Sequence, residues 1–417
     1  MKAEIFKTVI PQTDIPVYLI YNKNLISNGG IYFSPENMAS PDVELDRFAV
    51  FSKIVASFFS MPNRTFEPDV IHCNDWHTGM VPQIIQNLSR FTTMPHKPKT
   101  IFTIHNLAYQ GFSNLDVAQK LGLDVKLDQT LKWDAQDNNL DFILQGIVGS
   151  DYVTTVSPHY ADEIQTPQFG EGMSEILKTR NARLVGILNG ISYDIFNPKT
   201  DGNIIEKYSP TTVSEGKAAN KAALQKEYGL EVNPNKPLLG IASRLVNQKG
   251  LDLVADALEK IIDLGYQVIV LGSGDPQLEF MFNEKSKRGD LSKNYKAIIK
   301  FSEEIAMKIY ASSDVFLVPS RYEPCGLTQI IAMKYGSVPV VRDVGGLHDT
   351  VEEGKTGFVF YNLTQKDLLD ALGRALVKYT QDKNGWKKMV LNAMNEDFSW
   401  DISAKKYVNL YRKAMNL

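Results

Sequence analysis

The chain has 417 residues, of which 43% are hydrophobic and 22% charged, and its formal net charge is −3. This length exceeds the size at which one hydrophobic core keeps growing, so we expect two domains. The small net charge and the scattered lysines give no field that would gather nucleic acid, and no apolar run is long enough to span a membrane.

The chain has two cysteines, Cys73 and Cys325, too few for a disulfide framework and without metal-ligand spacing. Residues Met1–Ile10 mix charged and apolar positions and lack the long apolar run of a secretory signal. The sequence therefore predicts a cytoplasmic protein that holds no metal ion and no cofactor.

Short strand-forming runs recur along the chain, each followed by a longer stretch of helical period, which is typical of parallel strand–helix–strand units. In the first half they are Val70–Cys73, Thr100–Ile104, Tyr152–Val156 and Leu184–Leu188. In the second half they are Leu238–Ala242, Val268–Leu271, Ala297–Phe301, Val315–Val318 and Val338–Val341. The pattern predicts an α/β fold with two doubly wound sheets.

A segment without clear apolar period separates the two halves. Asn197–Gly216 contains Pro198, Gly202 and Pro210 among small polar residues, which favours a connection between domains with a boundary near Pro198. Ligands of open α/β sheets bind outside the carboxyl ends of the strands, so we looked for chemistry in the loops that follow the predicted strands.

Two such loops in the first half carry polar side chains beside a histidine. Asp75 lies in the loop His72–His77, and His105 and Asn106 lie in the loop Thr103–Gly111. These side chains suit contacts with sugar hydroxyls. The alternatives are a helix N-cap at Asp75 and a histidine that only closes its loop at His105.

The loop Ser243–Gly250 places Arg244 and Lys249 five positions apart, between a strand and the next helix. Two cations beside free backbone N–H groups suit a diphosphate, the arginine as a fork and the lysine as a point charge. The alternative is a solvated turn, and we favour phosphate binding.

The loop Pro319–Gln329 follows the strand Val315–Val318 and leads into a helix expected from about Leu327. Glu323 is placed there to accept hydrogen bonds from sugar hydroxyls, and the helix N-terminus offers N–H donors to phosphate. The alternatives are a solvated charge at Glu323 and a merely buried small residue at Cys325.

Two glycine loops carry weaker signals. The turn of Gly272 and Gly274 lacks the rest of a dinucleotide fingerprint and by itself indicates only a tight turn. In the loop Val344–Thr350, a helix-starting turn with Asp349 in its first helical turn is about as plausible as direct ligand contact. Phe301 is a candidate for stacking on a base, although core packing is the commoner fate of such a ring.

Four motifs of the second half, in this order, resemble the second domain of glycogen and starch synthases, which are retaining glycosyltransferases of GT-B architecture: SRLVNQKG, LGSGD, SRYEPCGLTQ and VGGLHDTV. The first half agrees through NDWHTG, TIHNLAYQG, TVSPHYADEIQTPQFGEGM and ILNGISYDIFNP. The segment Asp397–Trp400 resembles the start of the last helix, which in such enzymes crosses back to the first domain. The resemblance implies two Rossmann-like domains with a cleft between them, at residues 1–198 plus 400–417 and at residues 199–399.

For the first domain, the resemblance implies that Asp75 and His105 line the glucose and acceptor side, with Asn106 beside them. It places Asn189 near the sugar and matches Tyr32, in a divergent segment, to a tyrosine near the sugar.

For the second domain, the resemblance implies that Arg244 and Lys249 hold the diphosphate and stabilise the departing nucleotide, while Glu323 binds glucose hydroxyls. Phe301 falls where the family places an aromatic ring against adenine. The other implied substrate-binding residues are Ser243, Gly272, Gly274, Cys325, Gly326, Leu327 and Thr328.

The implied reaction is transfer of glucose, with retention, from ADP-glucose to the non-reducing 4-hydroxyl of an α-1,4-glucan. UDP-glucose remains the alternative donor, because both donors share the diphosphate and glucose contacts. No Asp-x-Asp motif occurs in the chain, which fits a site that uses Arg and Lys where other transferases use a metal ion.

The chain departs from the family pattern in one respect. Family members begin with a strand leading into a Lys-Thr-Gly-Gly-Leu loop, and this sequence contains no such motif. Its opening, Glu4–Val9 and Val17–Tyr21, resembles a hairpin that the family has later in that domain. A truncated chain, a partner polypeptide that completes the first domain, and a variant that has lost catalysis are the three explanations.

Two other functions stay open at this stage. One is a related GT-B transferase with a different acceptor, against which the QFGEGM and EPCGLTQ segments argue. The other is a fragment that binds nucleotide or glucan without turnover.

Overall fold

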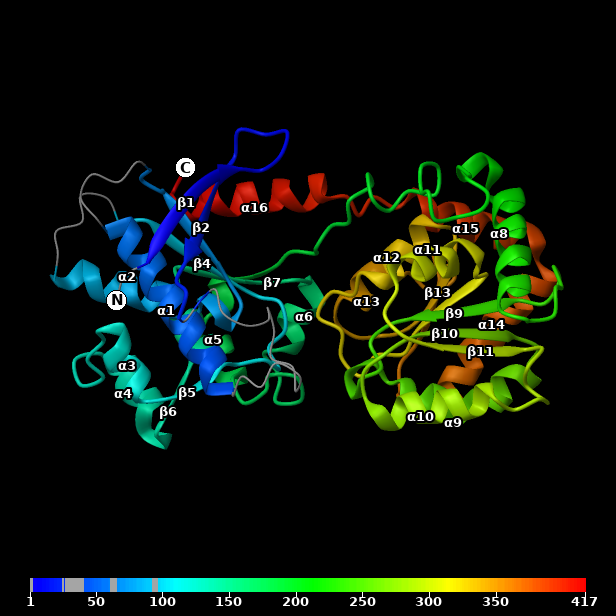
Figure 1. Ribbon diagram of the computed structural model, residues 1–417, viewed down its shortest axis with the longest axis horizontal. Coiled ribbons are helices and arrows are strands. Elements are labelled where there is room, and N and C mark those ends of the chain that lie inside the picture. Colours follow the sequence, from blue (N-terminus) through cyan, green and yellow to red (C-terminus); the bar gives the residue numbers. More distant parts are fainter. Residues whose placement is uncertain (1–2, 25, 27–40, 61–65, 92–96) are drawn as a thin grey trace. The chain divides into compact units, whose positions relative to one another are not determined.

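The computed structural model describes residues 3–24, 26, 41–60, 66–91 and 97–417. The chain divides into two compact units (Figure 1). Unit 1 comprises Met1–Thr155, Ala161–Gly186 and Val408–Leu417, and unit 2 comprises Val156–Tyr160 and Ile187–Tyr407. The domain limits expected from the sequence stay a prediction. Within the described ranges, no helix combines the length and the apolar character that crossing a membrane requires.

Unit 2 is built on a parallel sheet of six strands in the order β11-β10-β9-β12-β13-β14. These strands are β9 (Leu238–Ala242), β10 (Gln267–Gly272), β11 (Tyr295–Ile299), β12 (Val315–Val318), β13 (Val338–Arg342) and β14 (Phe358–Phe360). From β9 the chain builds one half of the sheet through β10 and β11, and from β12 the other half through β13 and β14. The strand order therefore reverses between β9 and β12.

The strands of this sheet form because their residues are apolar on both faces. Every residue of β9, β10 and β12 is buried, which is the pattern of a parallel sheet covered by helices on both sides. Figure 1 shows α9 and α10 below the sheet and α11 and α12 above it.

The helices of unit 2 begin at side-chain caps in several places. Asp275 accepts hydrogen bonds from two backbone N–H groups of α10, and Ser302 and Thr364 each accept one at α11 and α14. The helices are α8 (Val213–Glu227), α9 (Leu251–Asp263), α10 (Pro276–Ser286), α11 (Glu303–Ser312), α12 (Thr328–Lys334), α13 (Gly345–Thr350), α14 (Gln365–Gln381) and α15 (Lys383–Asn395).

Unit 1 contains a parallel sheet in the order β3-β4-β7-β8 and two antiparallel pairs, β1-β2 and β5-β6. The described strands of its parallel sheet follow one another in chain order. The strands are β1 (Glu4–Val9), β2 (Pro16–Tyr21), β3 (Val70–Asn74), β4 (Lys99–Ile104), β5 (Phe112–Asn114), β6 (Asn139–Asp141), β7 (Tyr152–Thr155) and β8 (Leu184–Gly186).

The helices of unit 1 include α2, which lies between β3 and β4 in the chain, and α5, which lies between β6 and β7. They are α1 (Pro41–Ser60), α2 (Met80–Phe91), α3 (Asp116–Leu121), α4 (Gln129–Asp134), α5 (Phe142–Gly149) and α7 (Ser174–Thr179). Two helices, α6 (Pro158–Glu163) and α16 (Trp400–Ala414), contain residues of both units.

All nine strands predicted for the two sheets are present, and no end differs from the prediction by more than two residues. The largest differences are β8, which ends at Gly186, and β11, which begins at Tyr295 and ends at Ile299. Strand β11 ends early because the chain turns after it, with the N–H of Lys300 bonded to the carbonyl of Ile298. Phe301 therefore lies outside the strand, and the predicted run Ala297–Phe301 was wrong at both ends.

Three short strands escaped prediction and one predicted hairpin is confirmed. The missed strands β5, β6 and β14 have only three residues each, too few to show a period. The hairpin of β1 and β2 pairs Glu4 with Tyr21 and Val9 with Pro16.

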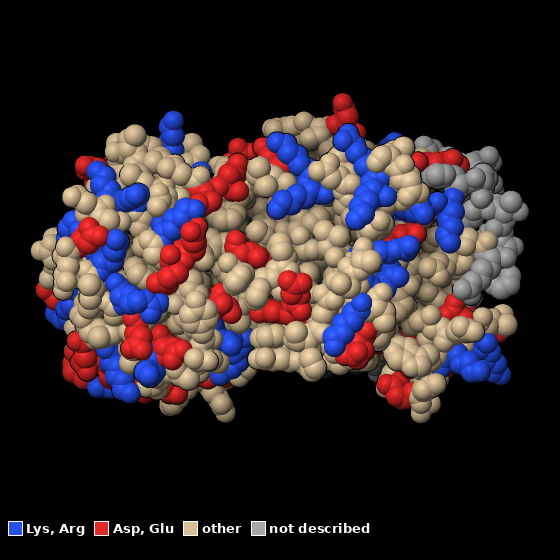
Figure 2. Space-filling model, turned by 180° about the vertical axis from the view of Figure 1, so that it is seen from behind, with Lys and Arg blue, Asp and Glu red and all other residues tan. Residues whose placement is uncertain are grey.

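On the face drawn in Figure 2, basic and acidic side chains are interspersed over both units.

Candidate functional site

The loops after β9 and β12 leave the sheet of unit 2 at its carboxyl edge, where the strand order reverses. This is the place at which open α/β sheets bind ligands. The loop after β9 ends in Lys249 and the loop after β12 carries Glu323. The Nζ of Lys249 lies 2.6 Å from Oε2 of Glu323, and only 17% and 7% of the two side chains are exposed. The two loops therefore bring a cation and a carboxylate together at this edge.

A residue of the same loop holds the Glu323 carboxylate, and a residue of a neighbouring helix holds the Glu323 backbone. Ser320 donates a hydrogen bond from Oγ to Oε2 at 2.8 Å. The N–H of Gly346, in the first turn of α13, donates to the carbonyl of Glu323 at 2.9 Å. Glu323 is thus a buried, oriented acceptor, and the alternative of a solvated loop charge is wrong.

A second ion pair joins the same two loops. The guanidinium of Arg321 binds both carboxylate oxygens of Asp252, at 2.7 and 2.6 Å, and also donates to the carbonyl of Asn247 at 2.9 Å. The Arg321 side chain donates strong hydrogen bonds to the Asp252 carboxylate, and these bonds lower the pKa of Asp252. The backbone N–H of Arg321 bonds to the carbonyl of Gln248, so side chain and backbone both fasten the loop of Lys249 to the loop of Glu323.

The glycine turn after β10 lies against the loop after β9. The N–H of Leu245 bonds to the carbonyl of Ser273, and residues Leu245 and Gly274 form a bridge. A Cβ at Gly272 would meet the carbonyl oxygen of Ser243 at 2.0 Å, and one at Gly274 would meet that of Leu245 at 2.5 Å. Gly272 and Gly274 are therefore required by close backbone contact, which explains them without reference to a ligand.

Arg244 and Phe301 are the exposed members of this edge. Arg244 is exposed, and its guanidinium makes no hydrogen bond or ion pair with the residues that the structure describes. Phe301 follows β11 and has 80% of its surface exposed, so the alternative of core packing is wrong for this ring. Both side chains are available to a ligand.

Cys325 lies under the turn that precedes α12. Burial raises the pKa of its thiol to about 12, so it stays protonated at neutral pH and does not act as a nucleophile. The backbone of Asn189 is near enough to lower the pKa of this thiol against the effect of burial, which places Asn189 at this turn. Gly326 has a φ of 68°, and Gln329 bonds its carbonyl at 2.8 Å.

The next two residues lead into helix α12. Leu327 occupies the N-cap position with 42% of its surface exposed, and Thr328 is the first helical residue. The helix therefore starts one residue later than predicted.

Asp349 has a structural role that sequence reasoning missed. It lies late in α13, not in its first turn, and its Oδ2 accepts bonds from Ser157 Oγ at 2.5 Å and from the N–H of His159 at 3.0 Å. The ring of His159 stacks on His348 with 3.9 Å between the centroids. These contacts attach residues 156–160 to unit 2.

In unit 1 the loops after β3 and β4 are joined by Asp75 and His105. Oδ1 of Asp75 accepts the backbone N–H of His105 at 2.8 Å, and Nε2 of His105 lies 2.9 Å from Oδ1 of Asn74. Asp75 occupies the N-cap position of the turn Trp76–Thr78 with a φ of 56°, but its side chain makes no capping bond there. Asn106 accepts the N–H of Ala108 at 3.1 Å and shapes its own loop.

The structure thus gathers the predicted residues into two groups. Asp75, His105 and Asn106 share one edge of unit 1. The group at the edge of unit 2 contains Asn189, Ser243, Arg244, Lys249, Gly272, Gly274, Phe301, Glu323, Cys325, Gly326, Leu327 and Thr328. Tyr32 lies outside the described residues. Sequence reasoning missed Asp252, whose only signal was its place in the first turn after a loop that carries two cations.

Two family models match the chain. Residues 1–179 match the starch synthase catalytic domain, and residues 225–388 match the glycosyl transferases group 1 domain. The two matches together cover most of both units.

Curated proteins and solved structures give similar results. The chain is 43% identical over 416 residues to a glycogen synthase of Exiguobacterium sibiricum, covering 97% of this chain and 83% of that protein. It is 41% identical over 420 residues to a glycogen synthase of Thermosipho melanesiensis, covering 99% and 84%. Its structure resembles the catalytic domain of starch synthase IV from Arabidopsis thaliana, solved with ADP and acarbose, with a TM-score of 0.88 and 32% sequence identity. The similarity covers 100% of this chain and 85% of that chain. These similarities confirm the predicted α/β class with GT-B architecture.

Proposed function

This chain belongs to the glycogen synthase family and is a hexosyltransferase, and from that premise we propose that it transfers glucose, with retention, from ADP-glucose to the non-reducing 4-hydroxyl of an α-1,4-glucan. The similar starch synthase structure is bound to ADP, which supports an adenine nucleotide as the leaving group. The observation that carries the proposal is the contact of Lys249 with Glu323 at the reversal of strand order in unit 2.

This contact places the two kinds of group that a nucleotide-sugar donor needs side by side. The diphosphate needs cations, which Lys249 and the unpaired, exposed Arg244 supply. The glucose hydroxyls need an oriented acceptor, which the buried carboxylate of Glu323 supplies. Phe301 offers an exposed ring against which an adenine base can stack.

The role of the cations follows from where charge develops. When the bond between the anomeric carbon and the phosphate oxygen breaks, negative charge grows on the departing diphosphate. Lys249 is held in place by Glu323 before this step, so it stabilises the transition state without reorganisation, and the exposed Arg244 adds a second positive charge. Each such donor contributes about 3 kcal/mol by analogy with other preorganised sites.

The second group, in unit 1, receives its roles from the resemblance. We propose that Asp75 and His105 contact the glucose and the acceptor, with Asn106 beside them. The direct bond between the Asp75 carboxylate and the backbone N–H of His105 supports a shared task, because it joins the two loops that carry these side chains. Within unit 2, we propose that Asn189 lies near the sugar.

The partner polypeptide considered from the sequence is not part of this proposal, because the comparisons with known proteins indicate none. The cytoplasmic location also stays a prediction.

The test is incorporation of radiolabelled glucose into glycogen from ADP-glucose and, in parallel, from UDP-glucose. We expect transfer from ADP-glucose at the higher rate, with the label released by an amylase specific for α-1,4 bonds. Faster transfer from UDP-glucose would refute the donor assignment alone. Transfer from neither donor, by a chain that binds ADP, would refute the proposed reaction.

A further inference from the structure

A cavity of about 550 Å³ lies in unit 2 between helices α8 and α15. Its floor is formed by residues that precede strands, including Pro234 before β9, Asp314 before β12 and Gly336 before β13. The cavity therefore opens at the amino edge of the sheet. The candidate donor loops leave the same sheet at its carboxyl edge, so this cavity is not part of the site described above.

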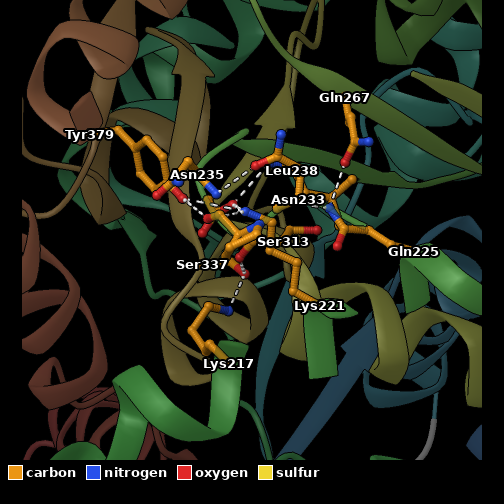
Figure 3. Close-up of polar contacts among 12 residues, drawn as sticks. Lys217, Lys221, Gln225, Asn233, Asn235, Leu238, Gln267, Ser313, Ser337 and Tyr379 are labelled. Carbon is orange, nitrogen blue, oxygen red and sulfur yellow. Dashed lines mark hydrogen bonds and ion pairs between the residues drawn. The ribbon is translucent and has the colours of Figure 1, made fainter. Parts of the chain in front are cut away.

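Two lysines of α8 reach the cavity floor, and both are buried (Figure 3). The ammonium of Lys217 donates to the carbonyls of Tyr310 and Ala311, at the end of α11, and of Tyr335, which follows α12, at 3.0 to 3.2 Å. It also bonds Ser337 at 3.0 Å. The C-terminal ends of helices carry partial negative charge, so these contacts stabilise the ammonium, but none of them is a carboxylate.

Lys221, one turn further along α8, has the carboxylate that Lys217 lacks. Its Nζ lies 2.7 Å from Oδ2 of Asp314 and also bonds the hydroxyl of Tyr379 and the carbonyl of Pro234. Asp314 also accepts the N–H of Leu238. This single carboxylate is therefore fully engaged by its immediate neighbours.

The charges that line the cavity do not balance. The lining contains four lysines, Lys217, Lys221, Lys383 and Lys387, and one acidic residue, Asp314. Lys221 pairs with Asp314, whereas the other three have no carboxylate within 4 Å among the described residues. Lys383 instead lies over the ring of Tyr379, with 4.2 Å from Nζ to the centroid. An anion inside the cavity would face three amines that form no ion pair with the described residues.

The rest of the lining suits a small polar molecule. Ser214, Gln225 and Asn384 offer hydrogen-bonding groups, and Trp386 and Val390 offer apolar surface. The volume falls within the range of about 300 to 1,000 Å³ that is usual for small-molecule sites.

We propose that this cavity binds a small phosphate monoester, whose dianionic head meets the ammonium groups and whose hydroxylated body lies against Trp386. Lysine ammonium groups bind phosphate as point charges, and a dianion neutralises two of them at once. Burial lowers the pKa of Lys217 to about 7, and a bound dianion would restore its proton. This binding does not depend on the proposed transferase reaction.

The test is isothermal titration of the full chain with glucose 1-phosphate, inorganic phosphate and glucose. We expect glucose 1-phosphate to bind more tightly than inorganic phosphate, and glucose not to bind in the same range. The double variant Lys383→Glu, Lys387→Glu should weaken glucose 1-phosphate binding by about tenfold or more, because two attractive charges become repulsive.

The matched control is Lys388→Glu, which makes the same charge change on the exposed face of α15 outside the cavity. It should bind glucose 1-phosphate as the unsubstituted chain does. All three lysines of α15 are exposed, so both glutamate variants should fold.

A measurement on the unsubstituted chain gives an independent check. Glucose 1-phosphate should protect Lys383 and Lys387 from acetylation while Lys388 reacts at its usual rate. The proposal is overturned if glucose 1-phosphate does not bind, if binding survives the double variant, or if Lys388→Glu weakens it equally.

Discussion

The ammonium of Lys249 and the carboxylate of Glu323 belong to loops 74 positions apart in the chain and lie 2.6 Å from one another. In this arrangement each charge lowers the cost of burying the other. We propose that a donor phosphate that contacts Lys249 takes over part of this role, which frees Glu323 to accept hydrogen bonds from the glucose hydroxyls.

Lys249→Ala should lower kcat/KM for ADP-glucose by about 100-fold, since one preorganised donor to the leaving group is worth about 3 kcal/mol. Lys260→Ala is the control, because Lys260 is an exposed lysine of α9 whose ammonium donates a hydrogen bond to Gln365 at 2.8 Å. Steady-state kinetics with radiolabelled donor measures both. Turnover of Lys249→Ala within a few-fold of the unsubstituted chain would refute the phosphate role.

Asp252→Asn should weaken ADP binding by about tenfold, because it removes the carboxylate that holds Arg321 and so loosens the loops of Lys249 and Glu323. Asp252 itself lies outside the predicted ligand contacts, so the effect would show positioning. Calorimetric titration with ADP measures it.

Glu259→Gln is the matched control for this substitution. Glu259 lies on the same helix and also binds two basic side chains, Lys285 and Arg288, away from the loops. Its substitution should leave ADP affinity unchanged. Equal weakening by both substitutions would show that general loss of an ion pair on α9, not the loop contact, is responsible.

Gly250→Ala should lower the free energy of unfolding of unit 2 by about 3 kcal/mol or more. Gly250 has a φ of 63°, and a Cβ there would meet the carbonyl oxygen of Pro319 at 2.2 Å. Gly229→Ala, with a φ of 73° and open space, should cost only about 1 kcal/mol. Gly289→Ala, with neither restriction, should be close to neutral. Denaturant unfolding of the three variants checks the order, and equal losses at Gly250 and Gly229 would refute the close contact.

The stability of unit 1 should fall as pH rises from about 4 to about 7. Burial raises the pKa of Asp134 to about 6 and that of Asp141 to about 7, from 3.8 for an ordinary aspartate. Across this window the folded chain binds more protons than the unfolded chain, so raising the pH favours unfolding. Above about pH 7 both states have lost these protons and the contribution is constant.

Asp134→Asn should reduce this slope and stabilise the chain by roughly 1 kcal/mol at pH 8, allowing for the partial exposure of the group. The asparagine oxygen can still accept the bonds from Gln145 and from the N–H of Asp141. Urea unfolding at pH 5 and pH 8, followed by tryptophan fluorescence, measures the slope. An unchanged slope in the variant would contradict the raised pKa.

The sequence predicted the sheets and the placement of the second-domain loops well, because buried parallel strands are continuous apolar runs. Val315–Val318 was predicted with both ends correct for this reason. Phe358–Phe360 escaped because a three-residue edge strand has no period to recognise.

The motifs also located the groups of the candidate site, but not how they contact one another. The sequence predicted that Lys249 binds phosphate and, separately, that Glu323 binds sugar hydroxyls. Their direct contact arises because β9 and β12 are neighbouring strands of the sheet. Asp252 stayed unnoticed, since an acidic residue in the first turn of a helix is explained by the helix dipole alone. Only the structure shows that Arg321 binds it.

The position of Lys217 limits how this part of the chain can vary in length. The amine of Lys217 bonds carbonyls at the C-terminal ends of both α11 and α12. The length of α12 is therefore constrained by the length of α11, because both helix ends must lie within reach of the same amine. An insertion of one residue in α12 would rotate the carbonyl of Tyr335 by about 100° and shift it by about 1.5 Å, out of reach of that amine. Since α12 starts at Thr328, beside Cys325 and Gly326, single-residue insertions there should be excluded among active relatives while surface loops vary freely.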